Sequence, residues 1–227
     1  MLQHRLSIPP QRLPRWLDGF AQRHGSPTIA VEPGHLTLSA PNGAEAEVEL
    51  IWGPVGTGDP IGELLEQIAR PRRLGALLIR KSSHAVGVFD GEALVASTIG
   101  RHYVQGRTKA GGWSQQRYAR RRENQAERAY AKAADAARTV LLPVVDELDG
   151  VILGGDARAL REVLDDAGLA PLARLTKRLP KRTLAVPDPN LRVLRSALPQ
   201  FVAVPISVND VARFDSAPAQ HDDQAGH

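Results

Sequence analysis

The sequence predicts an α/β protein: a mixed β-sheet with flanking helices, preceded by a small N-terminal α+β module. Two observations carry this prediction. From Leu74 onward, apolar β-rich runs and segments of helical periodicity follow one another in the order βββ-α-β-α-β-α. The 227 residues are also enough for one large or two small domains. We therefore divide the chain into an N-terminal module at 1–72, a second domain at 73–214 and a disordered tail at 215–227, which is rich in Ala, Gln, Asp and His.

The N-terminal module combines short helices with alternating strands. Apolar residues at helical spacing predict helices over Gln11–Phe20 and Ile61–Arg70. Period-two alternation predicts strands over Thr28–Val31, Leu36–Ser39 and Glu45–Ile51. A turn at Pro41-Asn-Gly43 separates the last two strands, and a loop rich in Gly and Pro over 53–60 precedes the second helix.

The second domain starts with three strands, expected at Leu74–Arg80, Ala85–Phe89 and Ala93–Val104. Asp90-Gly91 predicts a tight hairpin between the second and third strands. A long helix is expected from about Ser114 to Leu142, where Pro143 kinks or ends it.

The remaining elements of the domain alternate strand and helix. We expect a buried strand at Gly150–Leu153, a turn at Gly154-Gly155, and a helix that Asp156 caps and that runs to Asp166. A further strand at Arg182–Val186 and a helix near Asn190–Leu198 complete the prediction.

Composition limits the chemistry that the chain can perform. It has no cysteine, so disulfides, thiolate metal sites and cysteine nucleophiles are excluded. Its start carries no apolar stretch typical of a signal peptide, and no apolar run approaches the ~18 residues of a membrane span. The seven histidines are scattered. We therefore expect a cytoplasmic protein that uses neither a metal ion nor another cofactor.

Positive charge is concentrated in one segment. The net charge of the chain is +4, yet residues 101–138 contain ten Lys or Arg against three acids. A basic segment in an otherwise slightly acidic chain predicts a surface that binds nucleic acid.

A loop with two adjacent glycines lies inside this segment. Gly111 and Gly112 allow the backbone to approach a crowded site closely. Gln115 follows at the start of the long helix and offers a donor and an acceptor but no titratable proton. Such a group suits a position where an oxyanion develops. The alternative is an ordinary strand-to-helix connection in which Ser114 caps the helix.

The long helix carries cations along one face. Spacings of four, three, four and four residues align Arg117, Arg121, Asn124, Arg128 and Lys132. This stripe can follow a phosphate backbone. The alternative is a solvated face on which Glu123 and Glu127 pair with neighbouring arginines.

These residues resemble a known family over about 74–205. The hairpin, the glycine–glutamine loop, the basic segment Arg117-Tyr-Ala-Arg-Arg-Arg-Glu-Asn-Gln125 and the run Val151-Ile-Leu-Gly-Gly155 resemble the catalytic middle domain of eukaryotic and archaeal class I peptide release factors. The run Gly112-Trp-Ser-Gln115 is similar to the Gly-x-x-Gln motif of the Vms-type release-factor-like proteins. The resemblance implies a compact bacterial member of that branch, with an RNase H-like sheet.

The resemblance also implies an activity, which is hydrolysis of peptidyl-tRNA on stalled large ribosomal subunits during ribosome-associated quality control. Gln115 would be the catalytic residue, with Gly111 and Gly112 permitting its approach. Because no stop-codon-reading domain is evident, release is expected to be independent of a codon. The expected partners are the large ribosomal subunit, its rRNA and peptidyl-tRNA, and the protein would act as a monomer. The residues expected to bind RNA are Arg107, Lys109, Trp113, Arg117, Arg120, Arg121 and Arg128.

Three alternatives stay open at this point. Gln116 competes with Gln115 for the catalytic role. The carboxylates of Asp146-Glu-Leu-Asp149 could serve an endonuclease that cleaves tRNA near its acceptor end, although they also suit the polar end of a helix. The protein could finally be a ribosome-binding or tRNA-binding module without activity.

Overall fold

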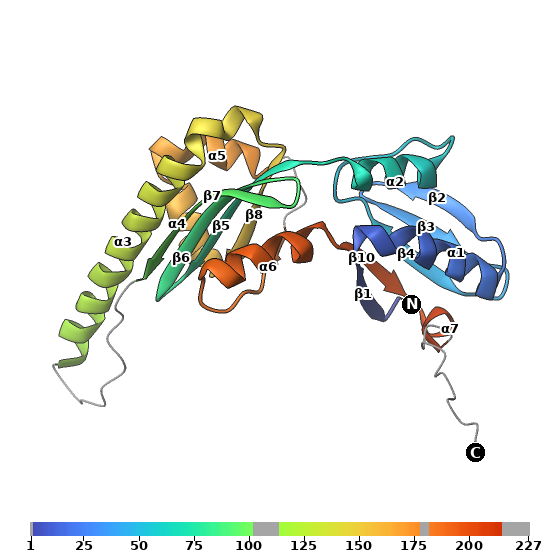
Figure 1. The fold of residues 1–227 in the computed structure, drawn as a ribbon. Helices are drawn as coiled ribbons and strands as arrows, with labels where there is room; N and C mark the ends of the chain where they lie inside the picture. Colours follow the sequence, from blue (N-terminus) through green and yellow to red (C-terminus); the bar gives the residue numbers. More distant parts are fainter. Residues whose placement is uncertain (1, 102–113, 178–181, 215–227) are drawn as a thin grey trace, which may run out of the picture. The chain divides into compact units, whose positions relative to one another are not determined.

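The computed structural model describes residues 2–101, 114–177 and 182–214, with the side chains of the long helix described from Gln125 onward. The chain forms two compact units. The first consists of Met1–Arg70 together with the segment that starts at Val202, and the second is Pro71–Phe201 (Figure 1). The predicted domain boundary at 72/73 lies close to the point between Arg70 and Pro71 where the chain first passes from one unit to the other. The predicted second domain, however, extends to 214, whereas the second unit ends at Phe201.

The first unit is built on a five-stranded antiparallel sheet in the order β1-β10-β4-β3-β2. Its strands are β1 (His4–Ile8), β2 (Thr28–Glu32), β3 (His35–Ser39), β4 (Glu45–Glu49) and β10 (Val204–Val208). Sequence reasoning missed β1 and β10, which pair with each other across the whole chain from His4↔Val208 to Ile8↔Val204. This long-range pairing explains why the residues after Val202 return to the first unit.

Helices cover one face of this sheet. They are η1 (Pro10–Arg12), α1 (Leu13–His24) and α2 (Pro60–Ala69), and the short α7 (Asp210–Phe214) follows β10. Leu17 and Phe20 of α1 and Leu64 of α2 are buried against Leu36, Val48 and Ile206 of the strands. The loop before α2 is fixed by that helix, because Glu63 accepts the N–H of Gly56 and Gln67 donates to the carbonyl of Pro54.

The second unit contains the predicted mixed sheet with flanking helices, which is thereby confirmed. The order is β7-β6-β5-β8-β9, with strands β5 (Arg73–Arg80), β6 (Ser83–Asp90), β7 (Ala93–Arg101), β8 (Gly150–Gly155) and β9 (Thr183–Leu184). Only β6 runs against the others, since β5 pairs with β8 and β8 with β9 in parallel. Numbered within the unit, the order is 3-2-1-4-5 with an antiparallel second strand, as in an RNase H-like sheet.

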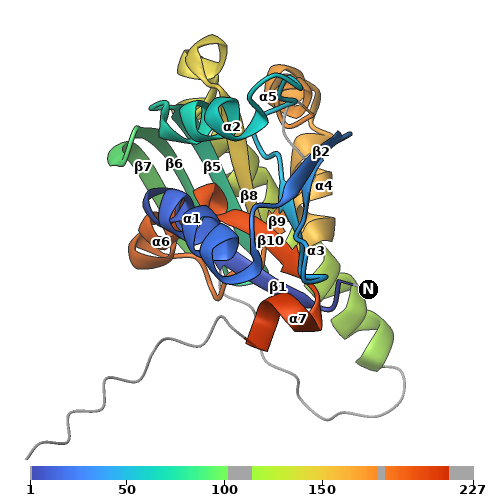
Figure 2. The same cartoon turned by 90° about the vertical axis from the view of Figure 1, so that its right-hand side faces the viewer.

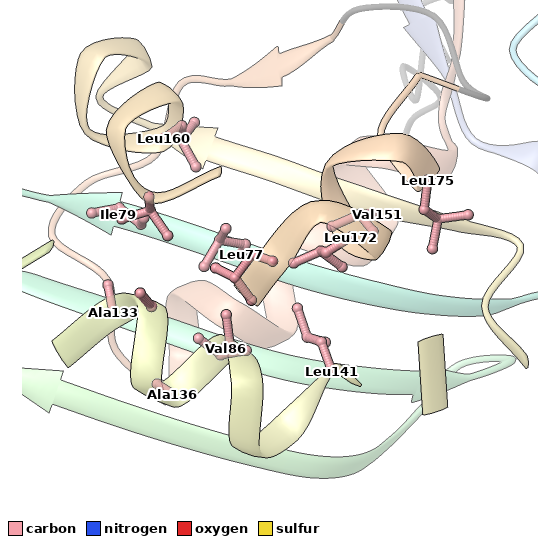
Figure 3. Close-up of a cluster of buried hydrophobic side chains, with 14 of the residues drawn as sticks. Leu77, Ile79, Val86, Ala133, Ala136, Leu141, Val151, Leu160, Leu172 and Leu175 are labelled. Carbon is pink, nitrogen blue, oxygen red and sulfur yellow. The ribbon is translucent and has the colours of Figure 1, made fainter. Parts of the chain in front are cut away.

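The long helix α3 (Ser114–Val140) packs on β6 and β7. Its buried residues are mostly alanines, which lie against Leu77, Val86 and Leu141 (Figure 3). The helix ends three residues before Pro143, which lies in the first turn of the 3-10 helix η2 (Leu142–Glu147). Gly87 points to the opposite face of the sheet, where Leu194 of α6 (Leu191–Val202) lies.

The corner after β8 differs in detail from the prediction. Gly154 and Gly155 are the last residues of β8, not a separate turn, because β8 pairs with β5 as far as Ile79↔Gly155. Gly155 adopts φ +100°, and a Cβ there would lie 2.0 Å from the carbonyl oxygen of Ile79. Asp156 caps α4 (Ala157–Leu164) as predicted by accepting the N–H groups of Arg158 and Ala159.

Two short helices follow α4. They are η3 (Ala167–Leu169) and α5 (Ala170–Leu175), and Leu172 and Leu175 of α5 join the same core as Leu160 of α4 (Figure 3). Sequence reasoning expected neither helix. The strand predicted at Arg182–Val186 is reduced to the two residues of β9, because only Thr183 and Leu184 pair with β8.

An ion pair holds the C-terminal end of α3. Arg138 donates to Asp166, which follows α4, and to Asp135 one turn earlier on α3. Asp166 also accepts the N–H of Gly168 at 2.8 Å. The bond from Arg138, followed by the N–H of Gly168, lowers the pKa of Asp166 below its usual value, and the same bond to Asp166 raises the pKa of Arg138.

We expect Gly155→Ala to destabilise the second unit by at least about 2 kcal/mol, because the new methyl group clashes with a backbone carbonyl at a positive φ. Gly91→Ala is the matched control. Its φ of +55° is also positive, but nothing lies within 4 Å of the added Cβ, so the expected cost is about 1 kcal/mol. Urea unfolding of both variants measures the two costs. Equal losses of stability would contradict the described path of β8.

The pKa shift of Asp166 predicts how stability depends on pH. A carboxyl with a lowered pKa in the folded state stabilises the protein above its ordinary pKa of 3.8, and this contribution is lost as pH falls through the folded pKa. Asp166→Asn should therefore lower the free energy of unfolding at pH 7. The difference from wild type should shrink as pH falls below about 4. Denaturant titrations across this range test the prediction, and a difference that does not change with pH would contradict it.

Candidate functional site

The start of α3 is the centre of the candidate site. Gln115 is the second residue of the helix, so it lies in its first turn. The first N–H groups of a helix have no acceptor within it, and the aligned peptide dipoles add partial positive charge at this end. An uncharged amide side chain and free backbone donors are therefore combined at one place. Such a place can bind an oxygen on which negative charge develops.

Several of the predicted site residues lie outside the described residues: Arg107, Lys109, Gly111, Gly112 and Trp113. The backbone of α3 includes Gln115 and the predicted RNA-binding positions 117, 120 and 121. These four positions thus share the first two turns of one helix, and Arg128 follows two turns later.

The N-terminal half of α3 extends past the ends of β6 and β7 in both views (Figures 1 and 2). We call this half, residues 114–126, the arm. Ala129 is the first residue of α3 among those with described side chains that is buried in the core. At 1.5 Å per residue, Gln115 lies about 21 Å along the helix axis from Ala129. The arm therefore presents the start of α3 away from the body of the second unit.

The two sides of α3 differ in charge. Arg128 and Lys132 are exposed, and they lie on the side opposite to the buried alanines at 129, 133 and 137. Positions 117 and 121 fall on this same side by their spacing. The predicted cationic stripe is thus exposed at the two positions whose side chains are described.

Carboxylates gather on another side of α3, a feature that sequence reasoning missed. A groove between α3 and α4 is lined by Glu127, Tyr130, Glu162 and Asp166. Burial raises the pKa of Tyr130, and the negative charges of Glu162 and Asp156 raise it further. Because acids repel phosphate, this side of the helix does not suit RNA, which leaves the stripe as the side that does.

Two of the three carboxylates in the segment Asp146–Asp149, those of Glu147 and Asp149, hold the fold. Glu147 forms an ion pair with Arg73, and Asp149 accepts the backbone N–H of Arg73 at 2.9 Å. Arg72 lies 4.0 Å from the other oxygen of Asp149. Within residues 2–101, 114–177 and 182–214, no three His, Asp or Glu side chains are grouped so that they could hold a metal ion. The reading of this segment as the polar end of a helix agrees with these contacts.

Among the helices that the structure describes, none is both long enough and apolar enough to cross a bilayer.

Curated proteins similar to this chain are archaeal release factors. The chain is 30% identical over 131 residues to peptide chain release factor subunit 1 of Thermococcus sibiricus, which covers 56% of this chain and 30% of that protein. It is 33% identical over 107 residues to the protein of the same name from Methanopyrus kandleri, covering 47% and 25%. The matched stretch thus spans about a third of the relatives' length or less.

A crystal structure of the archaeal translation termination factor aRF1 superposes with a TM-score of 0.42 and 16% sequence identity, covering 86% of this chain and 62% of the other. The fold of the second unit is defined by the order and direction of its strands. The sequence model of one family matches residues 72–207, which is more than half of the chain and includes the whole of the second unit from Arg72. This chain belongs to the Actinobacteria/chloroflexi VLRF1 release factor family.

Proposed function

We propose that this protein is a ribosome-dependent peptidyl-tRNA hydrolase that releases nascent chains from stalled large-subunit complexes. The observation that carries the proposal is the location of Gln115 in the first turn of a projecting helix, inside the stretch that the release factor family matches. The quality-control role comes from the resemblance of Gly112-Trp-Ser-Gln115 to the Vms-type motif.

The substrate in this proposal is the ester between a nascent peptide and the terminal ribose of tRNA. Water attacks the ester carbonyl, and the negative charge that develops on its oxygen needs hydrogen-bond donors. Gln115 has no titratable proton, so it contributes by positioning water and by donating hydrogen bonds from its amides. Removing one donor of this kind typically costs about 3 kcal/mol, or a hundredfold to a thousandfold in rate.

Charge supports the assignment of RNA to the second unit. Pro71–Phe201 contains 23 Lys or Arg and 13 Asp or Glu, a net charge of +10. The rest of the chain has six Lys or Arg and twelve Asp or Glu, a net charge of −6. The unit that carries the arm is therefore the one suited to a polyanionic partner such as rRNA or tRNA.

The endonuclease alternative needs a general base or a metal site. Of the carboxylates of Asp146, Glu147 and Asp149, which were the candidates for such a site, the last two are engaged with Arg73 and its backbone. Hydrolysis of the ester by positioning and electrostatics needs neither group. We therefore favour release over cleavage of the tRNA.

Gln115→Ala is the direct test. We expect the rate of release of a labelled nascent chain from stalled large-subunit–peptidyl-tRNA complexes to fall by about a hundredfold or more, with binding to the complex retained, because one donor to the developing oxyanion is lost. The measurement is a single-turnover release assay with gel analysis of the tRNA 3′ end.

Gln116→Ala is the matched control, since the two glutamines are neighbours at the start of α3. Wild-type release with an intact tRNA, lost in the Gln115 variant alone, supports the proposal. If release is lost in the Gln116 variant alone, Gln116 is the catalytic residue instead of Gln115. A trimmed tRNA end indicates the endonuclease, and binding without release in wild type indicates a binding module.

The cationic stripe gives a second test. In the double variant Arg128→Gln/Lys132→Gln, affinity for large subunits should fall, and the slope of log affinity against log salt should drop by about one per lost phosphate contact. Arg195→Gln is the control, because it removes an exposed arginine from α6 on the opposite face of the sheet. Equal salt slopes in the double variant and wild type would exclude the exposed part of the stripe from the RNA contact.

A further inference from the structure

The arm makes the position of Gln115 sensitive to small rotations of α3. Gln115 and Arg138 are 23 residues apart on one continuous helix, which corresponds to about 35 Å at 1.5 Å per residue. A rotation of about 3° about the C-terminal end of a rod of this length moves its far end by about 2 Å. Displacements of about 1 Å can cost roughly a hundredfold in rate when a reaction depends on positioning.

The packing of α3 on the sheet limits such rotation only in part. From Gln125 onward, where the side chains of the helix are described, its buried residues are Ala129, Ala133, Ala134, Ala136 and Ala137, all at or below 8% exposure. Short side chains let the helix approach the sheet closely, but they interdigitate little with the strands. This face fixes the distance between helix and sheet more firmly than it fixes the angle of the helix within the plane of the sheet.

The side chain of Arg138 supplies a contact of a different kind. It links α3 to Asp166, a residue outside the helix, as well as to Asp135 within it. Asp166 is itself fixed, because it also accepts the N–H of Gly168 at 2.8 Å. The guanidinium lies close to this corner, since a Cβ on Gly168 would meet its Nε at 3.0 Å. Charge-assisted bonds of an arginine to a carboxylate are directional as well as strong.

We propose that Arg138 and Asp166 are positioning residues for release, which fix the angle of α3 on the sheet and thereby place Gln115 at the far end of the arm. The inference rests on the proposed function, because it assigns the two residues to the reaction of Gln115. They act about 35 Å away from it along the helix, so neither touches the substrate.

Location supports this assignment over a purely stabilising role. The pair connects the end of α3 that is farthest from Gln115 to the α4–η3 corner. At a partly exposed position, one such pair contributes little to global stability. Its directional restraint on a long rigid helix is the larger effect.

Two variants remove the charge pairing with little change in shape. Asp166→Asn keeps an oxygen that can accept the N–H of Gly168 but loses the charge opposite Arg138. Arg138→Gln removes the positive charge opposite Asp166. Arg138→Lys restores that charge but lacks the second nitrogen with which a guanidinium can donate. Asp188→Asn is the matched control, because it removes the same kind of charge from an arginine–carboxylate pair, Arg80–Asp188, that does not involve α3.

The first measurement does not depend on the reaction. Because the chain has no cysteine, spin labels can be placed at Ala119→Cys on the arm and Glu92→Cys on the β6–β7 hairpin, and the distance distribution between them reports the angle of the arm. We expect this distribution to broaden in Asp166→Asn and Arg138→Gln, to narrow again in Arg138→Lys, and to stay as in wild type in Asp188→Asn.

The second measurement is single-turnover release at saturating protein, together with affinity for the stalled complex. The rate should fall roughly tenfold to a hundredfold in Asp166→Asn and Arg138→Gln, while affinity stays within about twofold and Arg138→Lys recovers part of the rate. If wild type releases nothing, the proposed function has failed. If wild type releases the nascent chain and both variants match it in rate and distance distribution, the positioning role is overturned. It is also overturned if rate and affinity fall together in the variants while their distance distributions stay unchanged.

Discussion

The close packing of alanines against an apolar sheet is the constraint on which the second unit depends. Ala133 and Ala137 of α3 are fully buried against strands whose inward residues include Leu77, Val86 and Val88. Larger side chains at these helix positions would lift α3 from β6 and β7, and with it the arm that carries Gln115. The same packing turns the side with Arg128 and Lys132 toward solvent, because burying one side of a helix sets its rotation about its own axis and thereby exposes the other side. Core, arm and cationic stripe thus follow from a single contact.

The corner after β8 supports this helix from the side. β8 pairs in parallel with β5 as far as Gly155, where only a residue without Cβ can lie beside the carbonyl of Ile79. The chain then enters α4 under the cap of Asp156 and reaches Asp166, which binds the end of α3. The strand, the cap and the ion pair therefore connect the centre of the sheet to the helix that presents the candidate site.

Charge separates the two units more sharply than the net charge of the chain suggests. The total of +4 is the sum of +10 on the second unit and −6 on the remainder. In the first sheet, Glu45, Glu47 and Glu49 alternate with the buried residues of β4, and Glu49 forms an ion pair with Arg5. This distribution of charge favours the second unit for the phosphate contacts that we propose.

The sequence by itself determined the elements whose signals are local. Asp90-Gly91 marked the hairpin of β6 and β7, Asp156 marked the start of α4, and Pro143 marked the end of α3, because each of these residues acts on its immediate backbone. The family resemblance was likewise carried by contiguous residues around Gln115. Tertiary structure alone decided what depends on distant partners. Strands β1 and β10 form only because they meet across some 200 residues of chain, so the C-terminal segment belongs to the first unit. The contact between Arg138 and Asp166 and the acidic groove beside Tyr130 need α3 and α4 side by side, and no local pattern encodes that approach.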